Sequence, residues 1–305
     1  MLQQQHFACA VALCYQNKSI MKQSKVWFVT GASKGLGLSL VQQLLVQGYA
    51  VAATSRSKED LKNAVGNHAN FLPLAVDINS EASVQKAIDE TVVRFGQLDI
   101  VVNNAGYGLA GGLEELSDAE ARKNFDVNVF GTLNVIRRVM PYLRAQESGH
   151  IFNISSIGGF IGTFPGFGIY CATKFAVEGL TEALSAEIKS FGIHATVVAP
   201  GYFRTQFLST GSLVVPEKPI EAYKEVRESE AFHRNIMDGN QLGDPEKAAL
   251  AMIQIAESKN PPLHLFLGAD AYDLAYNKIN SIREELEAWK SVTVSTAFEH
   301  QPVEA

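Results

Sequence analysis

The stretch that decides the fold is Thr30-Gly31-Ala32-Ser33-Lys34-Gly35-Leu36-Gly37, which joins the apolar run 26–30 to a segment with helical periodicity over 36–46. Glycines between a strand and a helix permit a tight turn and the close approach of a pyrophosphate, and the helix N-terminus supplies amide donors and the positive end of a dipole. The glycine spacing is G-x-x-x-G-x-G, not the more general G-x-G-x-x-G. Such a turn alone can also serve geometry only, so the rest of the chain has to decide whether it binds phosphate.

Strand-like and helix-like segments alternate from Lys25 onward. Strands are expected over 26–30, 50–54, 71–76, 99–103, 151–155, 193–199 and 264–266, and helices over 36–46, 58–65, 80–95, 117–144, 168–191, 245–258 and 272–290. The apolar runs are nearly continuous, which is typical of strands covered on both faces. We therefore predict an α/β, doubly wound Rossmann fold with a central parallel sheet of about seven strands flanked by helices on both faces.

The two ends of the chain and one internal stretch differ from this alternation. The apolar run 7–15 has no Lys or Arg before it and no clear cleavage site after it, which disfavours a signal peptide. We predict that residues 1–20 are a disordered or dispensable extension and that 21–305 form one domain. The stretch from about 203 to 243 is too long for an ordinary connection, so we predict a lid over a binding site.

Composition and charge exclude several classes of protein. The 305 residues carry a formal net charge of −6 with no basic run, which argues against nucleic acid or an anionic membrane surface as the main partner. No apolar stretch reaches the length of a membrane-spanning helix. The cysteines are Cys9, Cys14 and Cys171, too dispersed for a disulfide framework, so we expect a reducing, cytoplasmic location. No cluster has metal-ligand spacing, and we expect no metal.

The end of the second expected strand bears on the choice of cofactor. Enzymes that use NAD usually place an acidic residue there to bind the ribose hydroxyls. Here the sequence is Thr54-Ser55-Arg56, without a carboxylate, and Lys34 lies inside the glycine turn. Two cations suit a ribose 2′-phosphate, so the pair predicts NADP(H), although solvated surface charges are the plain alternative.

Two polar motifs point to acid–base chemistry. Tyr170 and Lys174 are four residues apart at the start of an expected helix, which places them on one face. A neighbouring ammonium stabilises a phenolate and so makes a tyrosine a better acid or base. Ser155 and Ser156 end the fifth strand, at the edge where doubly wound sheets bind ligands, and a hydroxyl there can donate to a carbonyl oxygen that gains negative charge. Each motif alone is common.

Taken together, the motifs resemble the short, single-domain type of the short-chain dehydrogenase/reductase family. The glycine turn, Asn103–Gly106, Asn128, Ser156, Tyr170 with Lys174, and Pro200-Gly201 occur in the family's order and spacing, over essentially Lys25 to Lys290. The sequence around Tyr170 is similar to bacterial members that resemble 17β-hydroxysteroid and retinol dehydrogenases.

The resemblance implies a role for each matched position. Tyr170 would be the general acid/base, Lys174 would lower its pKa and hold the nicotinamide ribose, Ser156 would polarise the substrate carbonyl, and Asn128 would hold a proton-relay water at a local break in its helix. Asp77 would contact the adenine and Thr205 the carboxamide. The candidate cofactor-binding residues are Gly31, Ser33, Lys34, Gly35, Leu36, Gly37, Ser55, Arg56, Asp77, Ile78, Asn104, Ala105, Gly106, Tyr170, Lys174, Pro200, Gly201, Phe203 and Thr205.

These observations predict an NADP(H)-dependent oxidoreductase that interconverts a ketone or aldehyde and an alcohol. Apolar residues after Pro200 predict a mainly apolar small-molecule substrate, and the family implies a homodimer or homotetramer. The alternative is a non-catalytic NADP(H)-binding protein that senses redox state or mediates assembly. A sugar-nucleotide epimerase is disfavoured by the glycine spacing. The physiological substrate and the direction of the reaction stay open.

Overall fold

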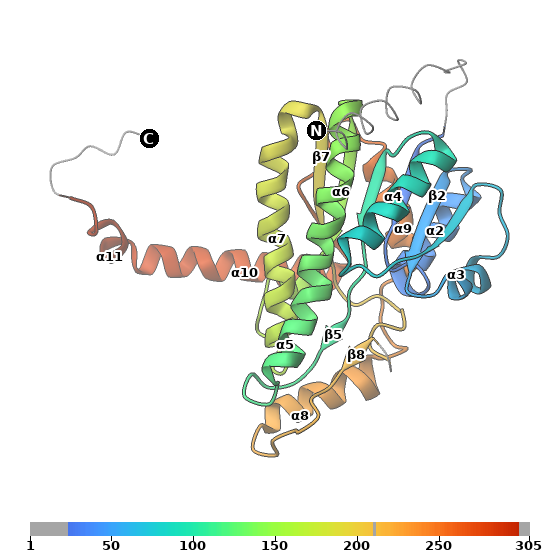
Figure 1. Cartoon of the computed structure of the whole chain (residues 1–305). Coiled ribbons are helices and arrows are strands. Elements are labelled where there is room, and N and C mark those ends of the chain that lie inside the picture. The colour runs from blue at the N-terminus through green and yellow to red at the C-terminus, as the bar shows by residue number, and fades with distance from the viewer. Residues whose placement is uncertain (1–23, 210–211, 299–305) are drawn as a thin grey trace.

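A seven-stranded parallel sheet forms the centre of the computed structural model, which describes residues 24–209 and 212–298 (Figure 1). Its strand order is β3-β2-β1-β4-β6-β7-β9, and the crossover between the two halves starts at β1. The predicted parallel sheet of about seven strands is therefore confirmed. The predicted extension, residues 1–20, lies outside the described residues. The strands are β1 (Val26–Val29), β2 (Ala50–Ser55), β3 (Phe71–Ala75), β4 (Ile100–Asn103), β6 (Gly149–Ile154), β7 (Ile193–Pro200) and β9 (His264–Leu267).

Helices cover both faces of the sheet because successive side chains of each strand point to opposite sides. On one face, Trp27 and Val29 of β1 belong to the apolar cluster that includes α2 (Gly35–Val46), α3 (Lys58–Val65) and α9 (Pro245–Ala256). On the other face, Phe28 belongs to the cluster that includes α4 (Glu81–Phe95), α6 (Gly131–Gln146) and α7 (Gly168–Ile188). A short 3₁₀ turn, η3 (Lys189–Phe191), follows α7.

The helix expected over 117–144 is interrupted. It consists of α5 (Asp118–Phe125), the π-helical turn η1 (Asp126–Phe130) and α6. Ser117 caps its start, because its side chain accepts from Glu120 N while the Glu120 carboxylate accepts from Ser117 N. The extra residue of the π turn falls at Asn128, where the family resemblance implies a break in the helix.

The segment predicted as an irregular lid contains regular structure. It holds the strand β8 (Leu213–Val214), the helix α8 (Lys224–Ala231) and the π-helical turn η4 (Phe232–Met237). β8 pairs in parallel with β5 (Gly108–Leu109), which follows β4. In Figure 1 this segment lies below the sheet, with α8 beneath α5. We keep the name lid for residues 203–243.

The last helices extend away from the sheet (Figure 1). α10 (Ala269–Ala288) begins against the 3₁₀ turn η2 (Ile157–Gly159), where Ala271 and Ala275 are buried, and α11 (Lys290–Val294) follows it. Side chains further along α10, such as Ile279 and Leu286, are exposed.

Candidate active site

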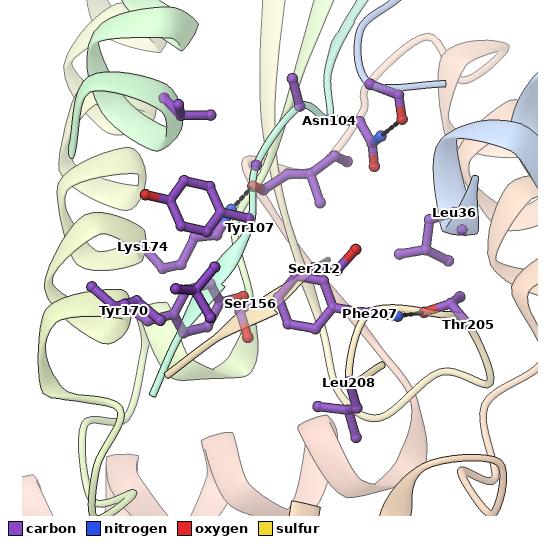
Figure 2. A pocket seen from close by; sticks show the side chains of 18 of the residues that line it. Leu36, Asn104, Tyr107, Ser156, Tyr170, Lys174, Thr205, Phe207, Leu208 and Ser212 are labelled. Atoms are coloured by element: carbon purple, nitrogen blue, oxygen red, sulfur yellow. Dashed lines mark hydrogen bonds between the residues drawn. The ribbon is translucent and has the colours of Figure 1, made fainter. Parts of the chain in front are cut away.

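One cavity of about 690 Å³ lies at the carboxyl ends of the strands, bordered by the glycine turn, the start of α7 and the lid. This is the edge where doubly wound sheets bind their ligands. Figure 2 shows Tyr170, Lys174 and Ser156 on one side of the cavity and Leu36 and Thr205 on the other, with Phe207 between them. Of the candidate residues from the sequence, all line the cavity except Gly37 and Asn128, which lie behind its wall.

The glycine turn has the backbone that its residues predict. Gly31 and Gly35 have φ of +65° and +61°, in the region that favours glycine. A Cβ at Gly31 would lie 2.7 Å from Ala105 Cα, whereas one at Gly35 would meet only Thr205 Cβ at 3.7 Å. The start of α2 has no side-chain cap and no acidic residue in its first turn. The space at Gly35 lets a ligand approach the backbone, and the uncapped amides at the start of α2 can donate to it. Both features fit a bound pyrophosphate.

Side-chain hydrogen bonds fix this turn to the segment after β4. Thr30 Oγ1 accepts from the amides of Asn104 and Ala105, both at 3.0 Å. Asn104 Nδ2 donates to the carbonyl oxygens of Thr30, at 3.0 Å, and Gly31, at 2.9 Å. A Cβ at Gly37 would lie 2.5 Å from that Nδ2 atom, so this glycine serves the packing of the turn and not the cavity surface.

Two cations border the part of the cavity at the end of β2. Lys34 is half-buried and Arg56 is exposed, and within the described residues neither side chain has a carboxylate partner. Glu59, which follows shortly after, pairs with Lys62 at 2.8 Å instead. Asp77 lies beyond, and its Oδ1 accepts from Asn79 N at 3.0 Å. The arrangement offers positive charge and no carboxylate directly after β2, where an enzyme that uses NAD usually has one.

Tyr170 and Lys174 lie in the first turns of α7 and both side chains are buried. Lys174 Nζ donates to the Ile154 carbonyl at 2.9 Å and lies 5.8 Å from the centre of the Tyr170 ring. Burial lowers the pKa of Lys174 to about 8, although Glu178 opposes this. Burial raises the pKa of Tyr170, with the interaction with Ser156 in opposition. Burial therefore dominates the pKa of Tyr170 in this geometry, and the lowering of that pKa by Lys174 stays a prediction.

The two serines after β6 have different hydrogen bonds. Ser155 is buried and its Oγ donates to the Lys174 carbonyl at 3.2 Å. Ser156 Oγ instead accepts from Gly158 N at 3.1 Å, and its hydroxyl interacts with that of Tyr170. Of the two serines, Ser156 is the one whose hydroxyl lies toward Tyr170, and its role at a carbonyl stays a prediction.

Asn128 holds the far wall of the site from the π turn. Its Oδ1 accepts from Tyr107 N at 3.0 Å, and its Nδ2 donates to Thr173 Oγ1 at 3.0 Å, next to Tyr170 in α7. A Cβ at Gly106 would lie 3.0 Å from Asn128 Oδ1 and 3.6 Å from Lys174 Nζ. Asn128 is therefore placed beside Lys174, and its side-chain amide is hydrogen-bonded to Tyr107 and Thr173.

Apolar side chains from the lid close the cavity around Tyr170. Leu208 and Leu213 are buried in one cluster with Phe167, Tyr170 and Cys171. The centre of the Phe207 ring lies 5.8 Å from that of Tyr170. Burial raises the pKa of Cys171 to about 11, which agrees with an inert cysteine; Cys9 and Cys14 lie outside the described residues.

Sequence reasoning missed several residues that shape the site. Asp270, at the start of α10, accepts from Tyr202 N at 2.7 Å through Oδ2 and so holds the turn that follows Pro200-Gly201. Tyr202, His233 and Gln241 also line the cavity. Their positions depend on contacts between distant parts of the chain, so no local sequence pattern predicts that they line the site.

Metal and membrane sites were also sought in residues 24–209 and 212–298. Within these ranges, no three His, Cys, Asp or Glu side chains are grouped so that they could hold a metal ion. None of the helices there has the length and apolar character needed to cross a membrane.

Comparison with known proteins agrees with this geometry. A family model described as short chain dehydrogenase matches residues 25–212. The 3-ketodihydrosphingosine reductase of Bacteroides thetaiotaomicron is 35% identical over 248 residues, which are 81% of this chain and 88% of that protein. The chain belongs to the short-chain dehydrogenase/reductase family, and it is accordingly an oxidoreductase with carbonyl and alcohol chemistry.

Solved structures extend the comparison to the cofactor. A short-chain dehydrogenase from Streptomyces avermitilis superposes with a TM-score of 0.83 at 35% identity, covering 91% of this chain and all 100% of that one. ElxO with NADP bound has a TM-score of 0.68 at 27% identity and covers 82% of this chain and 99% of its own. The ElxO complex supports a nicotinamide cofactor for this chain.

Proposed function

We propose that the protein is an NADP(H)-dependent enzyme that interconverts a ketone or aldehyde and an alcohol, with Tyr170 as the general acid/base. The observation that carries the proposal is the shared cavity, which brings Tyr170, Lys174 and the hydroxyl of Ser156 to the same strand edge as the glycine turn. Such an assembly brings together a proton donor and a hydrogen-bond donor for the developing oxyanion.

Each residue of the site has its own role in the proposed mechanism. When bound, the nicotinamide supplies or accepts a hydride. Ser156 donates its hydroxyl proton in a hydrogen bond to the carbonyl oxygen as that oxygen gains charge. Tyr170, whose pKa is raised by burial and which is therefore a neutral phenol, gives its proton to the same oxygen in reduction. Lys174 keeps positive charge beside the phenol and holds the ribose, and Asn128 fixes the neighbouring backbone.

The preference for NADP(H) rests on Lys34 and Arg56. Both are cationic, line the cavity and lack carboxylate partners within the described part of the chain. A guanidinium forks onto a phosphate with two hydrogen bonds, which suits Arg56 to a 2′-phosphate. The NADP bound to the relative ElxO supports the same choice.

The substrate is proposed to be largely apolar and covered by the lid. The relative from Bacteroides thetaiotaomicron is named for reduction of a keto compound, which supports a ketone as substrate. Leu208, Leu213 and Phe207 of the lid pack around Tyr170, so closure over a bound substrate would exclude water from the reaction. One domain from residue 21, a homodimer or homotetramer and a cytoplasmic location complete the proposal.

Tyr170→Phe tests the proposal. We expect turnover of a good ketone substrate to fall by about 10²- to 10⁴-fold, the usual share of general acid–base catalysis, with NADPH affinity retained. Tyr272→Phe is the matched control, because that tyrosine is exposed on α10, far from the cavity lining. The measurements are NADPH absorbance with a panel of ketones and a cofactor titration.

The same experiment separates the alternative function. A non-catalytic NADP(H)-binding protein would bind the cofactor and turn over none of the ketones, aldehydes or alcohols in the panel. Wild-type turnover by Tyr170→Phe under conditions where chemistry limits the rate would refute the assignment of Tyr170.

A further inference from the structure

Three polar side chains outside the proposed catalytic group line the cavity. Tyr202 follows Gly201, His233 lies in the π turn η4, and Gln241 is near the end of the lid; all three line the cavity. The Tyr202 hydroxyl lies 2.8 Å from His233 Nε2. The mechanism proposed above uses none of these groups.

The direction of the hydrogen bonds follows from the partners of His233. Its Nδ1 lies 2.7 Å from the Ser229 carbonyl oxygen, which can only accept, so Nδ1 carries the proton and donates. Burial lowers the pKa of His233, which keeps the ring neutral and makes Nε2 an acceptor. Tyr202 therefore donates its proton to Nε2. Its phenolic oxygen is left with lone pairs and no proton to give, so it is an acceptor for a further group.

Gln241 is the second unusual group. Its side chain is 1% exposed, and within the described residues neither Oε1 nor Nε2 has a hydrogen-bond partner. Its backbone is fixed, because Arg204 Nε donates to the Gln241 carbonyl at 3.2 Å. A buried amide without partners is costly, and buried polar groups are normally satisfied by protein, water or ligand. An apolar residue would be the better choice if this position served packing alone.

These groups lie close to the proposed reaction centre. The centre of the Phe167 ring is 6.5 Å from that of Tyr170 and 4.6 Å from that of His233. The Phe167 ring therefore lies in contact with both Tyr170 and His233. The cavity wall between them is apolar, with Leu208 in the same cluster as Phe167. A ligand held at Tyr170 therefore reaches the polar groups across an apolar surface.

We propose that Tyr202 and Gln241 form a second polar subsite that binds a hydroxyl group of the substrate, so that the substrate is a hydroxylated ketone or the corresponding diol with an apolar remainder. The substrate hydroxyl donates to the Tyr202 oxygen, and the Gln241 amide donates to the oxygen of the same hydroxyl. This rests on the proposed function, which supplies the reacting carbonyl at Tyr170.

Matched ketones test the subsite. The probes are acetophenone, its three ring-hydroxylated isomers and the three methoxy counterparts, which keep the oxygen but cannot donate. For the isomer that fits, we expect the wild type to favour hydroxy over methoxy by at least about fivefold in kcat/KM, the effect of one neutral hydrogen bond. Tyr202→Phe should bring that ratio close to its value in solution reduction. Gln241→Leu should instead lower kcat/KM for both the hydroxy and the methoxy compound relative to acetophenone, because both keep the oxygen that accepts from the amide. Comparing ratios between variants removes the intrinsic reactivity of each ketone.

The control variant is Tyr223→Phe, which removes a hydroxyl from the same lid at a position that bonds Glu114 and does not line the cavity. It should keep the wild-type ratio. Gln241→Leu has a second readout, because loss of an unpartnered amide should leave the unfolding temperature unchanged or raise it. A clear fall in that temperature would show a structural role for Gln241 and contradict the proposal.

Failure of the subsite and failure of the proposed function give different results. If ketones are reduced but the hydroxy-to-methoxy ratio is the same in wild type and Tyr202→Phe, the subsite is refuted while the enzyme assignment stands. If no ketone is reduced, the proposed function fails, and titration of the same compounds onto the NADP⁺-saturated protein decides the subsite. Equal affinity for hydroxy and methoxy compounds there would refute it.

Discussion

The glycine turn at 30–37 and the lid at 203–243 border the same cavity but are held by different kinds of contact. The turn is fixed by hydrogen bonds among its own backbone, Thr30 and Asn104, directly above the buried strands β1 and β4. The lid is attached mainly to the segment after β4. It is held through the two-residue pairing of β5 with β8, through hydrogen bonds to Glu114, Glu115 and Glu120, and through the ion pair in which Arg227 Nη2 lies 2.7 Å from Glu115 Oε2. Leu208 and Leu213 of the lid also pack around Tyr170.

This difference follows the ligand that each region serves. The turn serves the cofactor, which is the same for every substrate, whereas the lid serves the substrate, which varies. A cofactor is constant, so its site can be built into the core, where displacement disturbs the whole sheet. The substrate side rests on side-chain contacts outside the central sheet, which can open locally without disturbing it, as is expected of segments with low local stability. Three substitutions test whether the two regions differ in this way.

The largest effect is expected from Gly31→Ala in the turn. The new Cβ would lie 2.7 Å from Ala105 Cα at a φ of +65°. Backbone strain and steric overlap should together lower the free energy of unfolding by about 2–4 kcal/mol. Cofactor affinity should fall with it, because the turn and Asn104 must move apart. Thermal unfolding and a cofactor titration measure both.

Gly48→Ala is the matched control for this change. Its φ of +82° gives the same conformational penalty, but a Cβ there meets nothing within 4 Å and the residue is far from the cavity lining. It should cost only about 1 kcal/mol and leave cofactor affinity unchanged. Equal effects of the two substitutions would show that the contact with Ala105 is unimportant.

A smaller effect is expected from Arg56→Ser at the cofactor end. A hydrogen bond to a charged group is worth roughly 1.5–3 kcal/mol, so the kcat/KM preference for NADPH over NADH should fall by about 10- to 150-fold, with little change for NADH. Lys58→Ser removes an exposed cation two residues away that does not line the cavity, and the preference should then persist. A wild-type ratio near one would mean that Arg56 is an ordinary surface charge.

The smallest effect is expected from Arg227→Met in the lid. It leaves the buried Glu115 carboxylate without its cation, but Arg227 is 25% exposed, so we expect a cost of about 1–2 kcal/mol, less than for a fully buried pair. That amount makes lid opening about tenfold more frequent, which limited proteolysis detects, while cofactor affinity should not change.

Arg234→Met is the corresponding control on the lid. Arg234 pairs with Glu230 on an exposed surface, and its loss should not alter the rate of cleavage. If Arg227→Met is cleaved no faster than the wild type, the ion pair does not hold the lid.

Much of the cofactor side could be predicted from local sequence. Continuous apolar runs placed all seven strands within a few residues, because buried parallel strands have a strong local signature. The glycine turn and the free charges Lys34 and Arg56 needed only their position after β1 and β2. All these features are encoded within a few residues of one another.

The substrate side could not be predicted in the same detail. α8 buries a single side chain, Val226, so its sequence has no apolar periodicity to mark a helix. The π turn at Asn128 adds one residue to a helix whose periodicity is otherwise continuous. The pairs Tyr202 with His233 and Glu115 with Arg227 join residues far apart in the chain, and only folding brings them together.

The contact between Asp270 and Tyr202 limits how parts of this protein can be exchanged with relatives. The family model ends at residue 212, yet the carboxylate that holds the Tyr202 amide comes from the first turn of α10, well beyond it. A chimera that imports a new lid and joins the parent chain before residue 270 keeps this anchor, and one that also imports the C-terminal segment has to bring an acceptor of its own. Crossover points for recombination should therefore treat the turn after Pro200 and the start of α10 as one inherited unit.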